Sequence, residues 1–375
     1  MHQKNWDIFC KVVDNFGDIG VCWRLARQLA TEQGIAVRLW VDDLESFRRL
    51  CPEIDPTLPA QTRRGVLVRR WTSPFPGTDV ADVVIEAFAC ELPVCYLASM
   101  AKRAPAWINL EYLSAESWVQ GSHGLPSPHP RLPLTKHFFF PGFAAGTGGL
   151  LRETGLIEAR DAWQGDAEHA WAKLGLPPPR PEETSVSLFC YENPALPELF
   201  ELWVEGSEAM RCLIPEGRAL AQAAAWIGRE HLNPGETVRQ GSLSLHALPF
   251  LAQEQYDHLL WACDLNFVRG EDSFVRAQWA AKPLVWHIYP QEDEAHCGKL
   301  DAFLERYCAD LPMAAATACR NFSQAWNCGR GVATSWPAYW NERIPLSAHS
   351  DRWANKLAER EDLASALVKF SERLL

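Results

Sequence analysis

The sequence predicts two sequential α/β domains, each built on a doubly wound parallel sheet. Three observations indicate this fold class. The chain has 375 residues, more than one domain usually contains. Apolar segments typical of buried strands alternate with amphipathic segments typical of helices, which is the pattern of parallel sheets covered on both faces. A proline-rich stretch at 174–184 interrupts the alternation, because proline resists both helices and central strands.

The first half of the chain carries the first alternation. Between 121 and 149 it becomes rich in proline, glycine and aromatic residues, which predicts a long surface loop. Such a loop serves as a binding surface or is a plain insertion, and both alternatives stay open. The other predicted elements are strands at 6–13, 35–42, 65–71, 81–88 and 107–113 and helices at 19–33 and 45–51.

The second half repeats the alternation without repeating the sequence. Predicted strands at 185–191, 210–217, 243–250, 265–268 and 283–289 alternate with helices at 196–206, 219–232, 253–264 and 272–281. The last segment has the pattern of one amphipathic helix that can pack back across the domain boundary. The predicted domains face each other across a cleft, and their bounds are 1–176 and 185–350, with a linker at 177–184 and the terminal helix at 351–375.

Composition and charge exclude several classes of function. The formal net charge is −11, whereas wrapping nucleic acid requires a basic surface, so a basic protein or a cationic acceptor group is the better partner. No apolar run is long enough to span a bilayer, and the N-terminus lacks the apolar region of a secretory signal, which predicts a cytoplasmic protein without membrane attachment. The twelve cysteines include no CxxC pair, so neither a zinc site nor a disulfide framework is expected.

The segment DNFGDIG follows the first predicted strand and precedes a helix, which is where doubly wound sheets bind ligands. It is not a dinucleotide fingerprint, because GxGxxG is absent. Its two carboxylates, Asp14 and Asp18, are candidates for chemistry at the mouth of a cleft. The alternative is ordinary turn chemistry, with Asp14 in an Asx turn and Asp18 as a helix cap.

A second segment, FVRGEDSFVRAQ, has the same position after a later strand. Arg269 ends the strand, and Asp272 or Ser273 can cap the following helix. A diphosphate would meet a guanidinium and free backbone amides there. The alternative is a common cap beside a surface arginine.

Aromatic residues gather at the ends of strands in the second domain. Phe189 and Tyr191 end one strand, and Phe250, followed by Gln253, ends another. A nucleobase needs a flat apolar face and a few polar groups for its edge. Each aromatic taken alone is more often part of the core, but their shared placement favours a binding site.

These motifs together resemble one family, the bacterial elongation factor P arginine rhamnosyltransferases. The resemblance is carried by DNFGDIGVCWRLARQL, by SLFCYE and by the long run LPFLAQEQYDHLLWACDLNFVRGEDSFVRAQWAAKPLVWHIYPQEDEAH. It implies an inverting GT-B glycosyltransferase that needs no metal or other cofactor. It also implies the donor dTDP-β-L-rhamnose, bound mainly by the C-terminal domain, and an arginine of elongation factor P as acceptor. Rhamnosylation then activates the factor for rescue of ribosomes stalled on polyproline.

The resemblance also implies roles for individual residues. Asp14 and Asp18, within the loop that includes Asn15, Phe16 and Gly17, match the family's motif aspartates, and Glu271 matches its essential glutamate. The positions associated with the donor are Phe189, Tyr191, Phe250, Gln253, Tyr256, Arg269, Asp272, Ser273 and Tyr289.

Arginine is a difficult acceptor, and this explains a need for carboxylates. A guanidinium stays protonated below a pKa of about 12, and its lone pairs are delocalised. A carboxylate can hold it through charge-assisted bonds and take a proton as the new bond forms. Asp18 is the candidate general base or the carboxylate closest to the attacking nitrogen. Asp14 orients the acceptor or shapes the loop, and Glu271 contacts acceptor or sugar. Two alternatives remain: another GT-B transferase with a small-molecule acceptor, and a catalytically silent protein-binding module.

Overall fold

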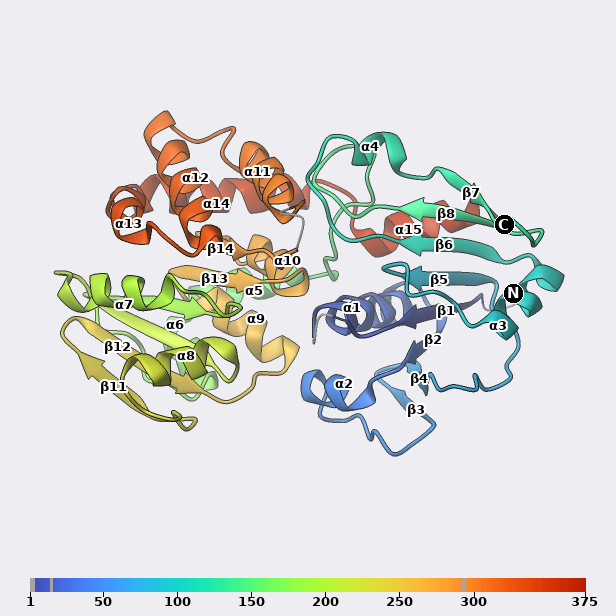
Figure 1. The fold of residues 1–375 in the computed structure, drawn as a ribbon, viewed down its shortest axis with the longest axis horizontal. Helices are drawn as coiled ribbons and strands as arrows, with labels where there is room; N and C mark the ends of the chain where they lie inside the picture. The colour runs from blue at the N-terminus through green and yellow to red at the C-terminus, as the bar shows by residue number, and fades with distance from the viewer. Residues whose placement is uncertain (1–3, 14–15, 292–294) are drawn as a thin grey trace. The chain divides into compact units, whose positions relative to one another are not determined.

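Two units, each with its own sheet, make up the fold (Figure 1). The structure is a computed structural model that describes residues 4–13, 16–291 and 295–375. The first unit comprises residues 1–154 and 359–375, and the second comprises residues 155–358. The stretch that the sequence assigns to a linker, 177–184, lies inside the second unit in this division.

The first unit is a mostly parallel sheet with helices. Within the described residues its sheet has eight strands in the order β3-β4-β2-β1-β5-β6-β8-β7, and only the outer strands β3 and β7 pair antiparallel. The elements are β1 (Asn5–Cys10), α1 (Gly17–Glu32), β2 (Ala36–Val41), α2 (Leu44–Leu50), β3 (Ala60–Arg63), β4 (Val66–Arg70), β5 (Val83–Ala87), α3 (Val94–Arg103), β6 (Ala106–Leu110), α4 (Val119–Ser122), β7 (Pro126–Pro128), β8 (Thr135–Phe139) and α15 (Leu363–Glu372).

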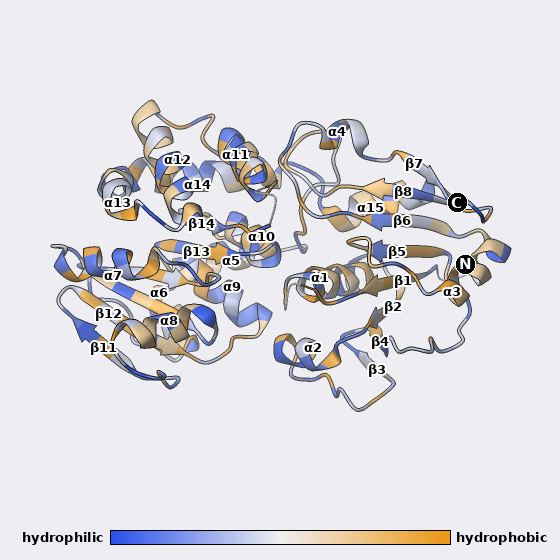
Figure 2. Cartoon of the chain, viewed as in Figure 1, coloured by the Kyte–Doolittle hydropathy of each residue, from blue (hydrophilic) through white to orange (hydrophobic). Residues whose placement is uncertain are grey.

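The second unit repeats the architecture with a smaller sheet. In the described part its order is β11-β12-β10-β9-β13-β14, and only β11 pairs antiparallel. Figure 2 shows the central strand β5 of the first sheet as hydrophobic and the edge strand β11 as hydrophilic. The elements are α5 (Leu156–Gly165), α6 (Ala167–Lys173), β9 (Glu183–Leu188), α7 (Leu196–Glu205), β10 (Ala209–Pro215), α8 (Arg218–Trp226), β11 (Thr237–Gln240), β12 (Leu243–Leu248), α9 (Gln253–Ala262), β13 (Leu265–Arg269), α10 (Asp272–Trp279), β14 (Leu284–His287), α11 (Ala295–Tyr307), α12 (Met313–Cys328), α13 (Val332–Asn341) and α14 (Arg343–Ala358).

The proline-rich segment 121–149 is more ordered than the sequence indicates. Its strand β8 pairs parallel with β6, and Phe139 at the end of β8 is buried against Phe370 of α15, with ring centroids 5.3 Å apart. The expectation of one long surface loop over 121–149 is therefore wrong for β8. A strand of five residues, three of them half-buried and one buried, is too short a signal beside the surrounding prolines.

The C-terminal segment forms two helices instead of the expected one. α14 ends at Ala358, and Asp362 caps α15 by accepting a hydrogen bond from the backbone N–H of Ser365 at 3.0 Å. The chain returns to the first unit past Gly149, whose φ is +72° and where a Cβ atom would lie 2.2 Å from the carbonyl oxygen of Glu361. Only glycine fits this approach without strain. Figure 1 shows α15 beside β6 and β8.

A buried carboxylate ties three elements of the first unit together. Asp7 in β1 is fully buried and accepts hydrogen bonds from Arg38 Nε at 2.5 Å and Nη2 at 2.6 Å, from Trp40 Nε1 at 3.2 Å and from the Tyr96 hydroxyl. Burial and the charge of Asp7 raise the pKa of Tyr96, so its hydroxyl remains a donor. The arginine and the carboxylate stand directly opposite each other on paired strands.

Replacing Asp7 tests how much this buried group stabilises the first unit. Asp7→Asn keeps the shape but leaves the Arg38 charge without its carboxylate, so we expect the free energy of unfolding to fall by about 3–5 kcal/mol. Glu53→Gln is the control, because Glu53 pairs with Arg64 at 2.9 Å on the surface, where such pairs contribute less than about 1 kcal/mol. Urea unfolding of the full chain measures both. Equal losses in the two variants would contradict the assignment.

Candidate functional site

The carboxyl-terminal edge of the second sheet holds an arginine between two aromatic rings. β9 and β13 are parallel neighbours, so the residues at their ends lie side by side. Arg269 Cζ is 4.5 Å from the ring centroid of Phe189 and 4.7 Å from that of Tyr191. Cation–π attraction therefore fixes the guanidinium at this edge. The sequence placed all three residues at strand ends, and the structure brings them together.

Further aromatic residues extend this cluster. The ring of Tyr256 in α9 is 5.4 Å from Phe189, and that of Tyr289, which follows β14, is 5.4 Å from Tyr191. Burial raises the pKa of Tyr256, which keeps its hydroxyl neutral. Phe250, two residues after β12, is half-buried at the same edge of the sheet. The edge thus combines flat apolar faces with one fixed cation.

The turn after β13 leads directly into α10. Gly270 has a φ of 60°, a left-handed conformation that suits glycine, and its carbonyl accepts a hydrogen bond from Trp286 Nε1 at 2.8 Å. The Ser273 hydroxyl donates to the Arg269 carbonyl and accepts from the Arg269 N–H at 3.2 Å. The helix begins at Asp272, with Glu271 as its half-buried N-cap residue. The expectation that Asp272 or Ser273 caps this helix is therefore wrong, since both lie inside it.

A hydrogen bond and a buried ion pair join α9 to α10. Gln253 Nε2 at the start of α9 donates to Asp272 Oδ2 at the start of α10, at 3.1 Å. One turn later, Arg276 donates to both oxygens of Asp257 at 3.0 and 2.8 Å, and both side chains are buried. Sequence reasoning missed this pair, although a charged residue on the apolar face of each helix was a usable signal. The pair positions Gln253, Tyr256, Asp272 and Ser273 together.

His287 is a buried member of the same cluster. It ends β14 in register with Arg269, and its ring contacts Tyr191 and Trp326 edge to face. Burial, followed by the charge of Arg269, lowers its pKa from 6.5 to about 4, so the imidazole is neutral at physiological pH. Its Nδ1 has no hydrogen-bond partner among the described residues. The structure thus places a buried, neutral imidazole beside the predicted donor residues.

Asp18 is the central carboxylate of the first unit's candidate site. It is the second residue of α1 and only 2% exposed, while Phe16 is the N-cap residue. The alternative that Asp18 caps the helix is therefore wrong. Its Oδ2 accepts a hydrogen bond from the Val13 N–H at 2.8 Å, and its Oδ1 accepts one from the Tyr112 hydroxyl at 3.0 Å. These two donors stabilise a carboxylate in one fixed orientation.

The other predicted residues of this loop are only partly described. Phe16 and Gly17 enter α1, and the guanidinium carbon of Arg49 lies 5.9 Å from the Phe16 ring centroid. Asp14 and Asn15 lie outside the described residues, so the roles expected for them stay predictions. Tyr112 is a neighbour of Asp18 that the sequence missed, because the predicted strand ran to 113 whereas β6 ends at Leu110.

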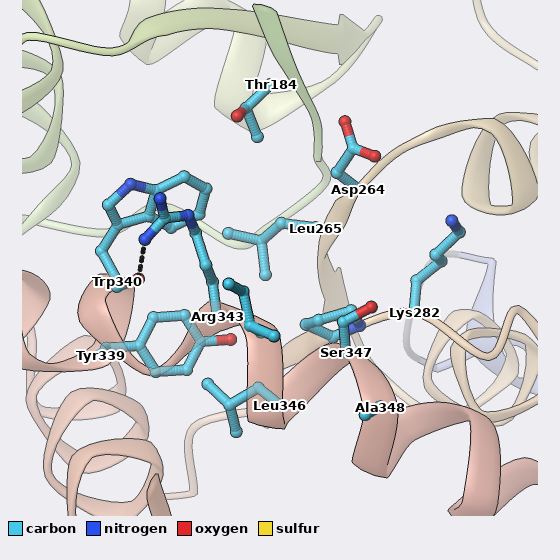
Figure 3. Close-up of a pocket in the computed structure, with 12 residues that line it drawn as sticks. Thr184, Asp264, Leu265, Lys282, Tyr339, Trp340, Arg343, Leu346, Ser347 and Ala348 are labelled. Carbon is cyan, nitrogen blue, oxygen red and sulfur yellow. Dashed lines mark hydrogen bonds between the residues drawn. The ribbon is translucent and has the colours of Figure 1, made fainter. Parts of the chain in front are cut away.

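A cavity of about 450 Å³ in the second unit lies away from these residues. Figure 3 shows it between the amino-terminal ends of β9, β13 and β14, near Thr184, Leu265 and Lys282, and helices α13 and α14. Arg343 Nη1 in this cavity donates to the Trp340 carbonyl at 3.1 Å. Ligands of doubly wound sheets bind at the carboxyl ends of the strands, so this cavity is not the predicted site.

Two features are absent from the described residues. No group of three or more His, Cys, Asp or Glu side chains is arranged to hold a metal ion in this part of the chain. Across the same ranges, no helix combines the length and apolar character needed to cross a membrane.

Comparison with known proteins identifies the family. The family described as elongation factor P (EF-P) rhamnosyltransferase EarP matches residues 6–372. The chain belongs to this family. A relative from Pseudomonas aeruginosa, named protein-arginine rhamnosyltransferase, is 51% identical over 373 residues, which cover 98% of this chain and 99% of the relative. The predicted membership of the EarP family is confirmed, and the chain is a glycosyltransferase.

Solved structures of relatives establish the fold. One, described as the structural basis for EarP-mediated arginine glycosylation of translation elongation factor EF-P, is 34% identical, with a TM-score of 0.72 and full coverage of both chains. The spinosyn rhamnosyltransferase SpnG is 11% identical, with a TM-score of 0.52 and coverage of 99% of this chain and all of its own, and shares the fold alone. The predicted GT-B fold with two Rossmann-like units is confirmed.

The lowered pKa of His287 predicts how stability depends on pH. The unfolded chain takes up a proton near pH 6.5, whereas the folded chain does so only near pH 4, so acidification through this window favours unfolding. His287→Gln should reduce the loss of unfolding free energy between pH 7 and pH 4 by about 2–3 kcal/mol. His231→Gln, which replaces an exposed histidine, is the control. Urea unfolding at each pH measures the effect, and an unchanged acid dependence in His287→Gln would refute the prediction.

Proposed function

We propose that this protein transfers L-rhamnose from dTDP-β-L-rhamnose to one arginine side chain of elongation factor P, with inversion at the anomeric carbon. The observation that carries the proposal is the family match over residues 6–372, together with the name of the P. aeruginosa relative. The modified factor would then relieve ribosomes stalled on polyproline, as the family resemblance implies.

The cluster around Arg269 supports a nucleotide-sugar donor in the second unit. A diphosphate carries negative charge, which a guanidinium fixed between Phe189 and Tyr191 can bind through two parallel hydrogen bonds. The first backbone N–H groups of α10 and its dipole favour an anion at the same edge. Phe250 and Tyr256 offer apolar faces for the base, and Gln253 offers an amide for its edge. Tyr289 is 48% exposed and borders the cluster.

Asp18 is proposed as the general base for the acceptor. A terminal guanidinium nitrogen forms a bond to C1 of rhamnose as the bond between C1 and the dTDP oxygen breaks. The electron pair of the broken bond leaves with dTDP, and Asp18 accepts the proton lost by the nitrogen. Attack opposite the leaving group converts a β-linked donor into an α-linked product. The Val13 N–H and the Tyr112 hydroxyl donate to the Asp18 carboxylate, which supports its proposed role by holding it in one orientation.

Two further carboxylates have proposed supporting roles. Glu271, at the N-cap of α10, would contact the acceptor or the sugar, and Asp14 would orient the guanidinium. No metal ion is proposed, because Arg269 and the α10 amides can neutralise the charge that grows on the leaving diphosphate.

Incubating the full chain with dTDP-L-rhamnose and purified elongation factor P tests the reaction. We expect the intact mass of the factor to gain one deoxyhexose, peptide mapping to place it on one arginine, and NMR to show the α configuration. The same yield is expected in excess EDTA. A factor that stays unmodified while the protein binds dTDP-rhamnose would contradict the proposal. Transfer to a small molecule would favour the first alternative function, and absence of donor binding would favour a silent binding module.

Asp18→Asn tests the proposed base. The amide cannot take the proton, so kcat should fall by about 10²–10⁴-fold. Stabilisation of the protein by dTDP-rhamnose should persist, because the donor cluster belongs to the other unit. Asp43→Asn is the matched control, since Asp43 caps α2 in the same unit through the N–H groups of Glu45 and Ser46. Initial rates at saturating substrates measure both. A near-normal kcat in Asp18→Asn would remove this residue from the chemistry.

A further inference from the structure

A small pocket in the first unit lies against the residues that hold Asp18. Its volume is about 250 Å³. Three neighbouring parallel strands end there: Lys11 and Val13 follow β1, residues 88–91 follow β5, and Tyr112 follows β6. Sites for drug-sized ligands usually measure about 300–1,000 Å³, so this pocket has room for roughly one long side chain.

Two of the lining residues contact the carboxylate directly. The Tyr112 hydroxyl donates to Asp18 Oδ1 at 3.0 Å, and the Val13 N–H donates to Oδ2 at 2.8 Å. Val13 is also largely exposed. Val13 and Tyr112 therefore belong both to the lining of the pocket and to the hydrogen-bond donors of Asp18.

The pocket has an aromatic wall. The rings of Phe88 and Tyr112 stack with their centroids 4.3 Å apart and their planes inclined by 13°. Tyr112 remains 40% exposed, which is unusual for a large ring that could have been buried. A planar guanidinium stacks well on such a surface and is attracted by its π electrons.

The backbone of the pocket wall is strained. Phe88, Ala89 and Glu91 have φ values of 55°, 53° and 58°, in the left-handed region that residues with a Cβ rarely adopt. The strain is held in place, because the Phe88 N–H donates to the Leu110 carbonyl at 2.7 Å and the Glu91 N–H donates to Glu86 Oε1 at 3.1 Å. Such strain collects where side chains must be presented in one orientation.

The charges of the pocket favour a cation. Glu91, which lines the pocket, is exposed, and the Asp18 carboxylate contacts two other lining residues. Among the described residues that line the pocket, Lys11 is the one basic side chain. An anion would have to approach the Asp18 carboxylate, which is unfavourable. A cation with a flat face matches both the carboxylates and the stacked rings.

We propose that this pocket binds the arginine side chain of the protein acceptor, with Phe88 and Tyr112 as the stacking surface and Glu91 as a second counter-charge. Tyr112 would also act as a positioning residue, because its hydroxyl orients Asp18. This inference rests on the proposed function and adds the residues that select an arginine.

Acceptor kinetics of pocket variants test the proposal at saturating dTDP-L-rhamnose. Tyr112→Ala removes the exposed ring, so the KM for elongation factor P should rise at least about tenfold, which corresponds to 1.4 kcal/mol. Glu91→Gln should raise it about threefold at low salt and less at high salt, since the charge is exposed. The KM for the donor should stay within about twofold of wild type, because the donor cluster lies in the other unit.

Tyr112→Phe separates stacking from positioning. The ring remains, so the KM for the factor should stay near wild type, whereas kcat should fall several-fold because Asp18 loses one donor. Leu58→Ala is the control for loss of an exposed apolar side chain in the same unit, and it should change neither constant.

The possible outcomes are distinct. If the wild-type protein modifies the factor but Tyr112→Ala and Glu91→Gln keep its KM, the pocket proposal fails and the proposed function stands. If the wild-type protein does not modify the factor, the proposed function itself fails. Circular dichroism reports whether Tyr112→Ala folds. If it does not, Glu91→Gln decides, because the hydrogen bond from Glu91 to Glu86 is donated by the Glu91 backbone and the Glu91 side chain is exposed.

Discussion

Parallel pairing of strands is the constraint on which both candidate sites depend. In a parallel ladder every strand presents its carboxyl end at the same edge, so residues far apart in sequence become neighbours. In the second unit this places Arg269 between Phe189 and Tyr191, which are about 80 residues away along the chain. In the first unit it places Tyr112 beside Asp18, across three adjacent strands. Neither arrangement would survive a change of strand order.

A buried ion pair in each unit connects elements that carry the candidate site. The ion pair of Arg276 with Asp257 joins α10 to α9, one helical turn away from the residues that are proposed to contact the donor. The ion pair of Asp7 with Arg38 joins β1 to β2 in the first sheet. A buried pair adds little net stability over apolar packing, but its geometry is demanding. These pairs therefore act mainly by fixing position, which a site that must align reacting atoms within about 0.5 Å requires.

The sequence predicted most of the fold, because long periodic segments such as α1 and buried runs such as β1 carry strong signals. It also located the strand-end residues around Arg269, because the segment FVRGEDSFVRAQ begins inside the strand that Arg269 ends. It missed β8, where prolines and glycines surround a short strand, and it overran β6, which hid Tyr112 inside a predicted strand. Pairs such as Asp257 with Arg276 join separate helices, and no local pattern can reveal which partner each charge will find. Similarly, the sequence of residues 88–91 does not predict a left-handed backbone conformation, because it contains no glycine.

The return of α15 to the first unit has a consequence for biosynthesis. The ribosome makes residues 1–154 first, but the helix that covers Phe139 follows only after the whole second unit has emerged. At about 5–20 residues per second, the first sheet waits roughly 10–40 s with this face uncovered. The later unit can thus finish folding before the earlier one. A nascent chain with an open apolar flank is a natural client for chaperones, and a stop codon a few residues early would harm the beginning of the protein more than its end.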